Sequence, residues 1–199
     1  MGYPYELRRG QPEFYPLALA VSAFGEHRQM GGRLFEELRA KRGLNYGDYA
    51  YAEAFVQDGW GTYPLPNVPR RLQQFSIWLR PVEHQHALFA VRAALHETRK
   101  LVKGGLSEDE LERQKGFLEG LTRLWEQTDS RRLGYALDEV FYGKKNHLGA
   151  FRAAMKQLQR EQVNATVKKY VRPDQLRIVI VTNEGEKLRQ AIVAGKPSP

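Results

Sequence analysis

Apolar residues recur along this chain with the two spacings that are typical of helices and strands. Residues 14–24 follow a three- and four-residue spacing that predicts a helix, although the alternation over 17–21 would also suit a strand. A second helix is expected over 32–42, and Gly43 can take the left-handed conformation that closes it. Aromatic and small residues then alternate over 46–56, which favours a long strand.

The middle of the chain combines a second strand with a long helix. A break at 58–61 and a proline-rich loop lead to a new alternation over 75–79, which predicts a strand antiparallel to the first. Pro81 opens a helical pattern that continues to the glycine pair at 104–105. This region therefore predicts a hairpin-like pair of strands followed by a helix.

The next helix has a well-defined start. Ser107 and Glu110 have the spacing of a capping box, in which each side chain binds the backbone amide of the other. Leu106 and Leu111 are placed as the hydrophobic staple that accompanies such a box. Further helices are expected at 131–142, 148–158, 161–170 and 186–194, and the apolar run at 176–181 predicts a buried strand.

This order of elements predicts an α+β fold, a two-layer sandwich of helices packed on a mainly antiparallel sheet. Residues 1–12 are punctuated by proline and glycine and are expected to form a linker without core residues. Residues 13–195 then form a single α+β domain, and 196–199 form a tail. We find no internal repeat with a period of about 20 to 50 residues.

Composition excludes several classes of protein. With 42% hydrophobic residues in 199, the chain has the make-up of a folded domain. It has no cysteine, which excludes disulfides, thiolate zinc sites and a cysteine nucleophile. No segment approaches the roughly 20 apolar residues of a membrane span. Lysine and arginine number 31 against 23 acidic residues, a net charge of +8, but the signs are mixed along the chain, which favours a solvated surface over nucleic-acid binding.

The histidines do not form a recognisable metal or catalytic motif. His96 is followed by glutamate, but position 100 is lysine, so the second ligand of H-E-x-x-H is missing, and H-x-x-E-H does not occur. His84 and His86 are two residues apart and diverge on a helix. His27 and His147 have no partner visible in the sequence. Phosphate-binding glycine loops are also missing, so we predict no catalytic residue and no metal ligand in this chain.

Arg39 and Tyr46 are the candidate binding residues. The helix at 32–42 brings Arg39 near its end, and the glycine turn leads to a strand that begins with Tyr46, so the two side chains can point toward a common space. A guanidinium and a phenol together offer hydrogen-bond donors to a peptide carbonyl or a developing oxyanion. The alternative is that Arg39 pairs with Glu36 while Tyr46 fills the strand edge.

The chain contains three motifs in order. The first is Gly-Arg-Leu-Phe at 32–35 with Leu-Arg at 38–39 and Gly-Leu-Asn-Tyr at 43–46. The second is Gly-Leu-Ser-Glu-Asp-Glu-Leu-Glu at 105–112, and the third is the closing helix and strand, within 162–181. Together they resemble the insulinase/pitrilysin family of zinc metallopeptidases, which includes the mitochondrial processing peptidase. The resemblance is to the second half of the family's paired domains, covers roughly residues 12–183, and makes 17–24 a helix rather than a strand.

The resemblance implies that two homologous α+β halves enclose a chamber. The first half supplies H-x-x-E-H and a distant glutamate for zinc, and the second supplies an arginine and a tyrosine that contact the substrate. Arg39 and Tyr46 fall on this pair, and no residue of this chain falls on the zinc motif. The start of the chain also suggests that the edge strand expected before the first helix has been trimmed. We therefore expect no cofactor here and zinc in the partner half.

The expected function is that of a non-catalytic half that clamps an extended peptide opposite a zinc-bearing half or subunit and is inactive alone. One alternative is a structural or interaction subunit with the same fold, as in respiratory complexes. A weaker one is a basic nucleic-acid-binding module. The compartment stays open between the bacterial cytoplasm and the periplasm, with the periplasm favoured. The expected partners are the zinc-bearing half and a peptide, with no nucleic acid and no membrane span.

Overall fold

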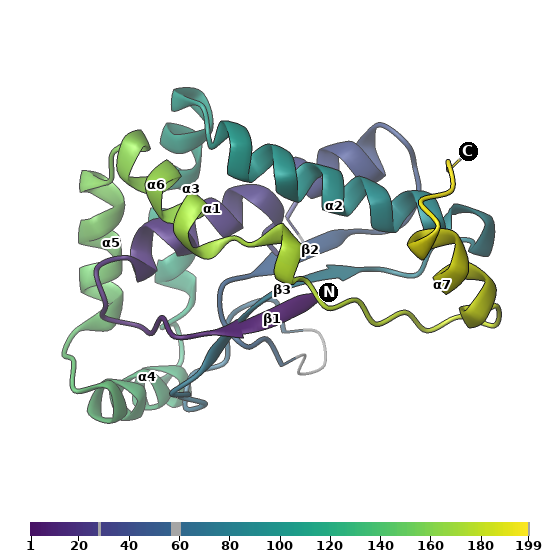
Figure 1. Ribbon diagram of the computed structural model, residues 1–199. Helices are drawn as coiled ribbons and strands as arrows, with labels where there is room; N and C mark the ends of the chain where they lie inside the picture. Colours follow the sequence, from purple (N-terminus) through teal and green to yellow (C-terminus); the bar gives the residue numbers. More distant parts are fainter. Residues whose placement is uncertain (28, 57–60, 199) are drawn as a thin grey trace.

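A computed structural model of the chain describes residues 1–27, 29–56 and 61–198. Its sheet has three strands, β1 (Gly2–Tyr5), β2 (Asp48–Tyr51) and β3 (Gln73–Leu79), in the order β1-β3-β2 with antiparallel pairing throughout. Helices lie over one face of this sheet, as Figure 1 shows, so the predicted α+β sandwich is confirmed. The predicted break at 58–61 falls mostly on 57–60, outside the described residues.

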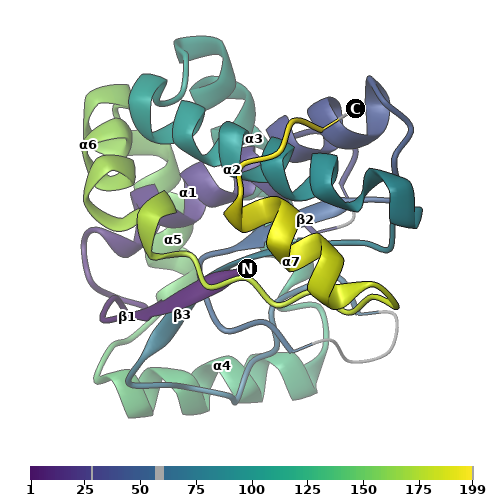
Figure 2. The same cartoon turned by 45° about the vertical axis from the view of Figure 1, so that its right-hand side comes forward.

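The helices follow the predicted order closely. Three short helical turns, η1 (Phe35–Ala40), η2 (His84–His86) and η3 (Pro173–Gln175), accompany seven longer helices in the described chain. Figure 2 shows α6 beside α1 and α7 beside α2. The seven are α1 (Phe14–Gly25), α2 (Ala87–Gly104), α3 (Glu108–Leu124), α4 (Asp129–Tyr142), α5 (His147–Gln157), α6 (Arg160–Tyr170) and α7 (Gly185–Val193).

The core lies between the sheet and the helix layer, with α1 at its centre. Leu17 and Phe24 of α1 are buried together with Phe75 and Ile77 of β3. Because α1 is surrounded by β2, α3, α5 and α6, nearly all of its residues are apolar rather than one stripe. This position explains why its sequence also reads as a strand: a fully buried element needs no polar face.

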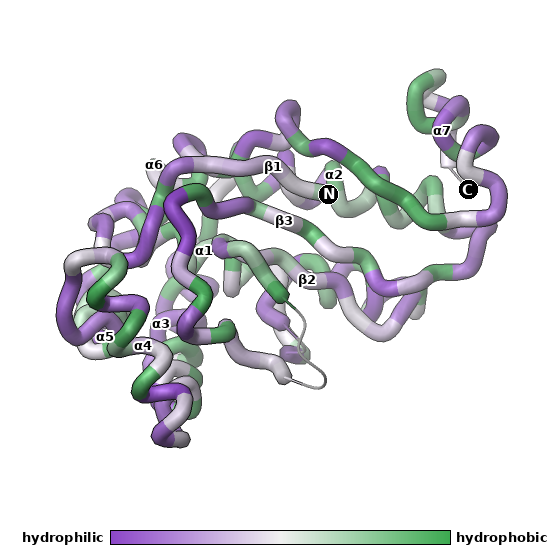
Figure 3. The backbone as a smooth tube through the Cα atoms, turned by 90° about the horizontal axis from the view of Figure 1, so that it is seen from below, coloured by the Kyte–Doolittle hydropathy of each residue, from purple (hydrophilic) through white to green (hydrophobic). Residues whose placement is uncertain are grey.

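Strand pairing sorts the side chains between the two faces of the sheet. Ala50 and its partner Ile77 face the helices and are buried. Tyr49 lies opposite Trp78, so these two side chains share the other face, which is turned to the viewer in Figure 3. The turn that carries Tyr46 lies just before β2, next to Tyr49 on this second face.

Three of the predicted helix ends are confirmed in atomic detail. The Ser107 hydroxyl accepts from the Glu110 amide, and the Glu110 carboxylate accepts from the Ser107 amide at 2.8 Å, which completes the capping box. Gly43 and Gly143 both take the left-handed conformation, with φ of 63° and 61°. Local chemistry therefore determines where these helices start and stop.

The expectation that residues 1–12 contribute nothing to the core is wrong, and so is the expected lack of a strand before the first helix. β1 pairs with β3, and Tyr3 and Leu7 are buried in the core. The Tyr3 hydroxyl donates to the Tyr170 carbonyl at 2.7 Å and accepts from the Arg172 amide at 2.8 Å. These long-range contacts make the polar segment part of the fold.

The predicted strand over 176–181 is also wrong. Gly2 and Arg177 form one isolated antiparallel bridge. After this bridge the segment pairs with no other strand among the described residues. Val179 and Val181 are 84% and 98% exposed. An apolar run predicts a buried strand only where a neighbouring strand covers it.

Two further elements are shorter than predicted. The strand expected over 46–56 is limited to β2, because the backbone beyond Tyr51 bonds to side chains: Ala52 accepts from the Tyr5 hydroxyl, and the Ala54 amide donates to Gln73 Oε1 at 3.0 Å. The helix expected from Pro81 begins only at the start of α2, after the turn η2. Neither difference moves the candidate binding residues.

Candidate functional site

Arg39 and Tyr46 lie next to each other on one turn. η1 ends just after Arg39, and the Gly43 amide donates to the Arg39 carbonyl at 2.7 Å, which turns the chain back. Arg39 Nη1 donates to the Tyr46 carbonyl at 2.7 Å, and the Arg39 Cζ atom lies 5.4 Å from the centre of the Tyr46 ring. The sequence-predicted residues are therefore brought together.

The pairing of Arg39 with Glu36 is not formed. In the part of the chain that the structure describes, no carboxylate lies within ion-pair distance of Arg39. Its guanidinium is instead held between two aromatic rings, with Cζ 5.2 Å from the Phe35 ring centre and a similar distance from that of Tyr46. Such stacking orients the cation and leaves N–H donors for another group.

Tyr46 is presented on the surface by a rigid turn. Its side chain is 83% exposed. The Gly47 amide donates to Asn45 Oδ1 at 3.2 Å, and Asn45 Nδ2 donates to Asp48 Oδ1 at 2.7 Å and to the Arg80 carbonyl at 3.2 Å. A Cβ at position 47 would lie 2.5 Å from the Tyr49 hydroxyl oxygen, so a larger residue than Gly47 would require the Tyr49 side chain to move.

Asp48 lies beneath this turn and is almost completely buried. Burial raises its pKa to about 6, although hydrogen bonds from Asn45 and from the Arg80 backbone act in the opposite direction. Its Oδ2 atom has no hydrogen-bond partner among the described residues. The carboxylate belongs to the turn's interior and does not reach the surface where Arg39 and Tyr46 lie.

Arg39 and Tyr46 line a groove of about 690 Å³ at this end of the sheet. Arg80, which directly follows β3, lines it too, and its Cζ atom lies 5.8 Å from the Tyr49 ring centre. The other lining residues are Gln29, Met30, Phe35, Tyr49 and Pro81. Sequence reasoning missed Arg80, because only the register of β2 on β3 places it beside the Tyr46 turn.

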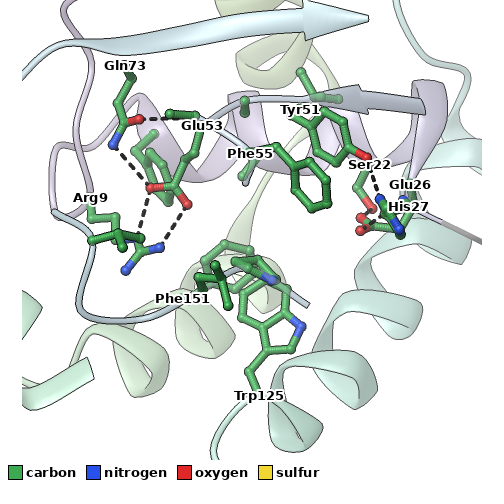
Figure 4. Close-up of a pocket in the computed structure, with 18 of the residues that line it drawn as sticks. Arg9, Ser22, Glu26, His27, Tyr51, Glu53, Phe55, Gln73, Trp125 and Phe151 are labelled. Atoms are coloured by element: carbon green, nitrogen blue, oxygen red, sulfur yellow. Dashed lines mark hydrogen bonds and ion pairs between the residues drawn. The ribbon is translucent and has the colours of Figure 1, made fainter. Parts of the chain in front are cut away.

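A second, smaller cavity of about 100 Å³ lies between α1 and the loop after β2. Figure 4 shows Arg9, Glu53 and Gln73 at one end of it and Ser22, Glu26, His27 and Tyr51 at the other. Arg9 Nε lies 2.8 Å from Glu53 Oε1, and Arg9 Nη1 lies 2.7 Å from Asp138 Oδ2, so the charges at this end of the cavity are paired. At the other end the Glu26 carboxylate accepts from the Ser22 hydroxyl, and burial raises its pKa. We assign the Arg9 end to the stability of the fold.

Metal-ligating side chains do not gather anywhere in the described residues: no three of them could hold an ion. His147 lies among the rings of Phe14, Tyr15 and Phe151, and burial lowers its pKa to about 3, so it is neutral. None of the helices in the described chain is both long and apolar enough to cross a membrane.

Comparison with known proteins identifies the family of the chain. A family model described as the peptidase M16 inactive domain matches residues 1–118. Among curated proteins, none shows significant similarity to the chain.

Several solved structures share the fold. The peptidase M16 inactive domain from Pseudomonas fluorescens aligns with a TM-score of 0.64 and 23% identity over 85% of this chain. This chain spans only 37% of that protein's length. A candidate zinc protease from Bordetella pertussis aligns with a TM-score of 0.62 and 15% identity, covering 90% of this chain and 92% of its own.

Proposed function

Because this chain belongs to the peptidase M16 family and is one of its inactive domains, we propose that it binds the peptide substrate of a zinc metallopeptidase opposite a zinc-bearing half. The observation that carries the proposal is the contact of Arg39 with Tyr46 on the rim of an open groove. A pair of donors held in place and left without a carboxylate is suited to binding a peptide carbonyl.

The chain's own residues have defined tasks in this proposal. Arg39 uses one N–H to hold the Tyr46 carbonyl, which leaves its remaining N–H groups to donate to a peptide carbonyl oxygen. The Tyr46 hydroxyl is a second donor, and its exposure allows it to reach a peptide that lies across the groove. Both donors would stabilise negative charge that develops on that oxygen during hydrolysis.

The backbone of β2 offers a second means of holding a peptide. β2 pairs with β3 on one side and is an edge strand among the described residues. An extended peptide can add to such an edge through main-chain hydrogen bonds, with no requirement on its sequence. Its side chains would then pass close to Tyr46, which lies just before β2.

The residues of this chain do not fit a zinc ion, since no cluster of ligands exists in the described part of it. The metal of the proposed enzyme therefore belongs to the partner half, which would activate the attacking water. We expect this chain to be inactive alone.

Peptide binding by the isolated chain tests the proposal directly. We expect labelled extended peptides to bind, and Arg39→Gln to weaken binding by about tenfold, the size of one lost charge-assisted hydrogen bond. Arg42→Gln is the matched control, because Arg42 lies three residues away and pairs with Glu37 outside the groove. Its affinity should stay within about twofold of the unmodified chain.

A second experiment restores the zinc-bearing half. Hydrolysis on mixing or fusing the two halves, with a loss in Arg39→Gln but not in Arg42→Gln, would support the substrate-binding role. No peptide binding and no restored hydrolysis would instead favour the structural or interaction subunit. Binding of nucleic acid that weakens steeply with salt would favour the basic module.

A further inference from the structure

The groove at Arg39 and Tyr46 is positively charged without compensation. Among the described residues, the eight that line it include two arginines, Arg39 and Arg80, and no aspartate or glutamate. Neither guanidinium lies within ion-pair distance of a carboxylate in residues 1–27, 29–56 and 61–198. Both side chains are half-buried, where the Coulomb attraction for an anion is stronger than in bulk water.

Arg80 is fixed in the groove by its neighbours rather than by an acid. Its amide donates to the Gly47 carbonyl at 3.3 Å, and its carbonyl accepts from Asn45 Nδ2 at 3.2 Å. Its guanidinium lies against the ring of Tyr49, which orients the cation without neutralising it. The backbone of Arg80 is thus tied to the same turn that presents Tyr46.

Two acidic residues near the groove are engaged elsewhere. Asp48 is buried beneath the turn, where it accepts from Asn45. Glu37 of η1 pairs with Lys41 and Arg42 on the surface. These two carboxylates therefore do not neutralise the arginines of the groove, and a ligand can supply the anion.

We propose that this groove recognises a carboxylate of the bound peptide, held between Arg39 and Arg80. This inference rests on the proposed peptide-binding function and names the class of peptide. Guanidinium groups bind carboxylates through paired, charge-assisted hydrogen bonds, and aromatic and thioether side chains such as Phe35 and Met30 can cover the aliphatic part of the ligand. The carboxylate can come from an acidic side chain or from the C-terminus of the peptide.

The test compares matched peptides on the full chain by fluorescence anisotropy. One position of an extended peptide carries Glu, Gln or Lys, and each peptide is made with a free and an amidated C-terminus. We expect the Glu peptide, or the free C-terminus, to bind about tenfold more tightly than its neutral counterpart. Arg80→Gln should reduce this preference to about twofold or less, and Arg80→Lys should keep part of it.

The peptide series and the variants together distinguish the possible outcomes. Arg42→Gln should keep the full preference, and thermal unfolding of each variant confirms that it is folded. If peptides bind but Glu, Gln and both C-termini are equivalent, the carboxylate proposal is overturned while peptide binding stands. If the preference exists but survives Arg80→Gln, the role of Arg80 is overturned. If no peptide binds, the proposed function itself fails.

Discussion

The two ends of the β2–β3 pair use arginine in opposite ways. Where β3 begins, Arg9 is buried, bonds to Glu53 and Asp138, and lies beside Gln73. Where β3 ends, Arg39 and Arg80 are half-buried, stack on aromatic rings and bond to no carboxylate in the described chain. Arginine thus lies in a charge-paired cavity at one end of β3 and lines an open groove at the other.

The two ends differ in whether each arginine has a carboxylate partner. Taking a charge out of water costs several kcal/mol unless an opposite charge and hydrogen bonds replace the lost solvent. Arg9 has these, so its removal would leave the buried Asp138 and the partly buried Glu53 without their partner. Arg39 and Arg80 keep contact with solvent and need no partner to be tolerated. The first end should therefore control stability and the second binding.

The largest expected effect is on Arg9. We expect Arg9→Met to lower the free energy of unfolding by about 3–5 kcal/mol, the usual cost of breaking a buried ion pair on one side. Denaturant titration measures this directly. Combining the substitution with Asp138→Asn should recover part of the loss, because one orphaned charge is then removed. A loss below about 1 kcal/mol would show that solvent reaches this end as well.

Asp48 tests whether the binding end contains any buried charge that matters for stability. Its pKa rises from 3.8 to about 6 on folding, so the folded state holds a proton that the unfolded state releases. Stability should therefore fall as pH rises through this window, by on the order of 2–3 kcal/mol. Asp48→Asn should remove the fall and make the variant the more stable protein at neutral pH. Equal pH profiles of the two proteins would contradict the assignment.

The sequence predicts best those features that depend on neighbouring residues. The capping box at Ser107 and the left-handed Gly43 follow from local chemistry, whereas the spacing over α1 suits a strand as well as a helix. The contact of Arg39 with Tyr46 could also be anticipated, because one helix end and one turn fix both residues.

What the sequence could not predict depends on distant partners. The polar segment before α1 becomes part of the core because Tyr3 meets Tyr170 and β3. The apolar run at 176–181 stays exposed because it pairs with the rest of the sheet only through a single bridge, between Arg177 and Gly2. Arg80 joins the groove only through strand register. Each of these outcomes depends on pairing across the chain, which hydrophobic periodicity does not encode.

Arg33 offers an intermediate case within the same motif as Arg39. Its Nε and Nη2 atoms each lie 2.8 Å from the Glu110 carboxylate, which also closes the capping box of α3. Arg33 and the Ser107 groups lower the pKa of Glu110 to about 2, despite partial burial. We expect Glu110→Gln to cost about 1–2 kcal/mol at neutral pH. Stability contributed by a carboxylate of lowered pKa is lost as pH falls from 4.5 toward about 2, so the two proteins should converge there. Parallel pH profiles would contradict this role.

The smallest effect on stability is expected at Arg39, and it separates the two ends most sharply. Arg39 makes one hydrogen bond to the Tyr46 carbonyl and stacks on two rings, all in contact with solvent. Arg39→Gln should therefore change the free energy of unfolding by less than about 0.5 kcal/mol, as for most exposed substitutions, while peptide affinity falls. Arg9→Met should instead lower the free energy of unfolding and leave peptide affinity unchanged, when affinity is measured at a low temperature at which the variant is folded. If Arg39→Gln instead destabilised the domain by several kcal/mol, its loss of binding would reflect an altered turn, and the division of labour between the two ends of β3 would not hold.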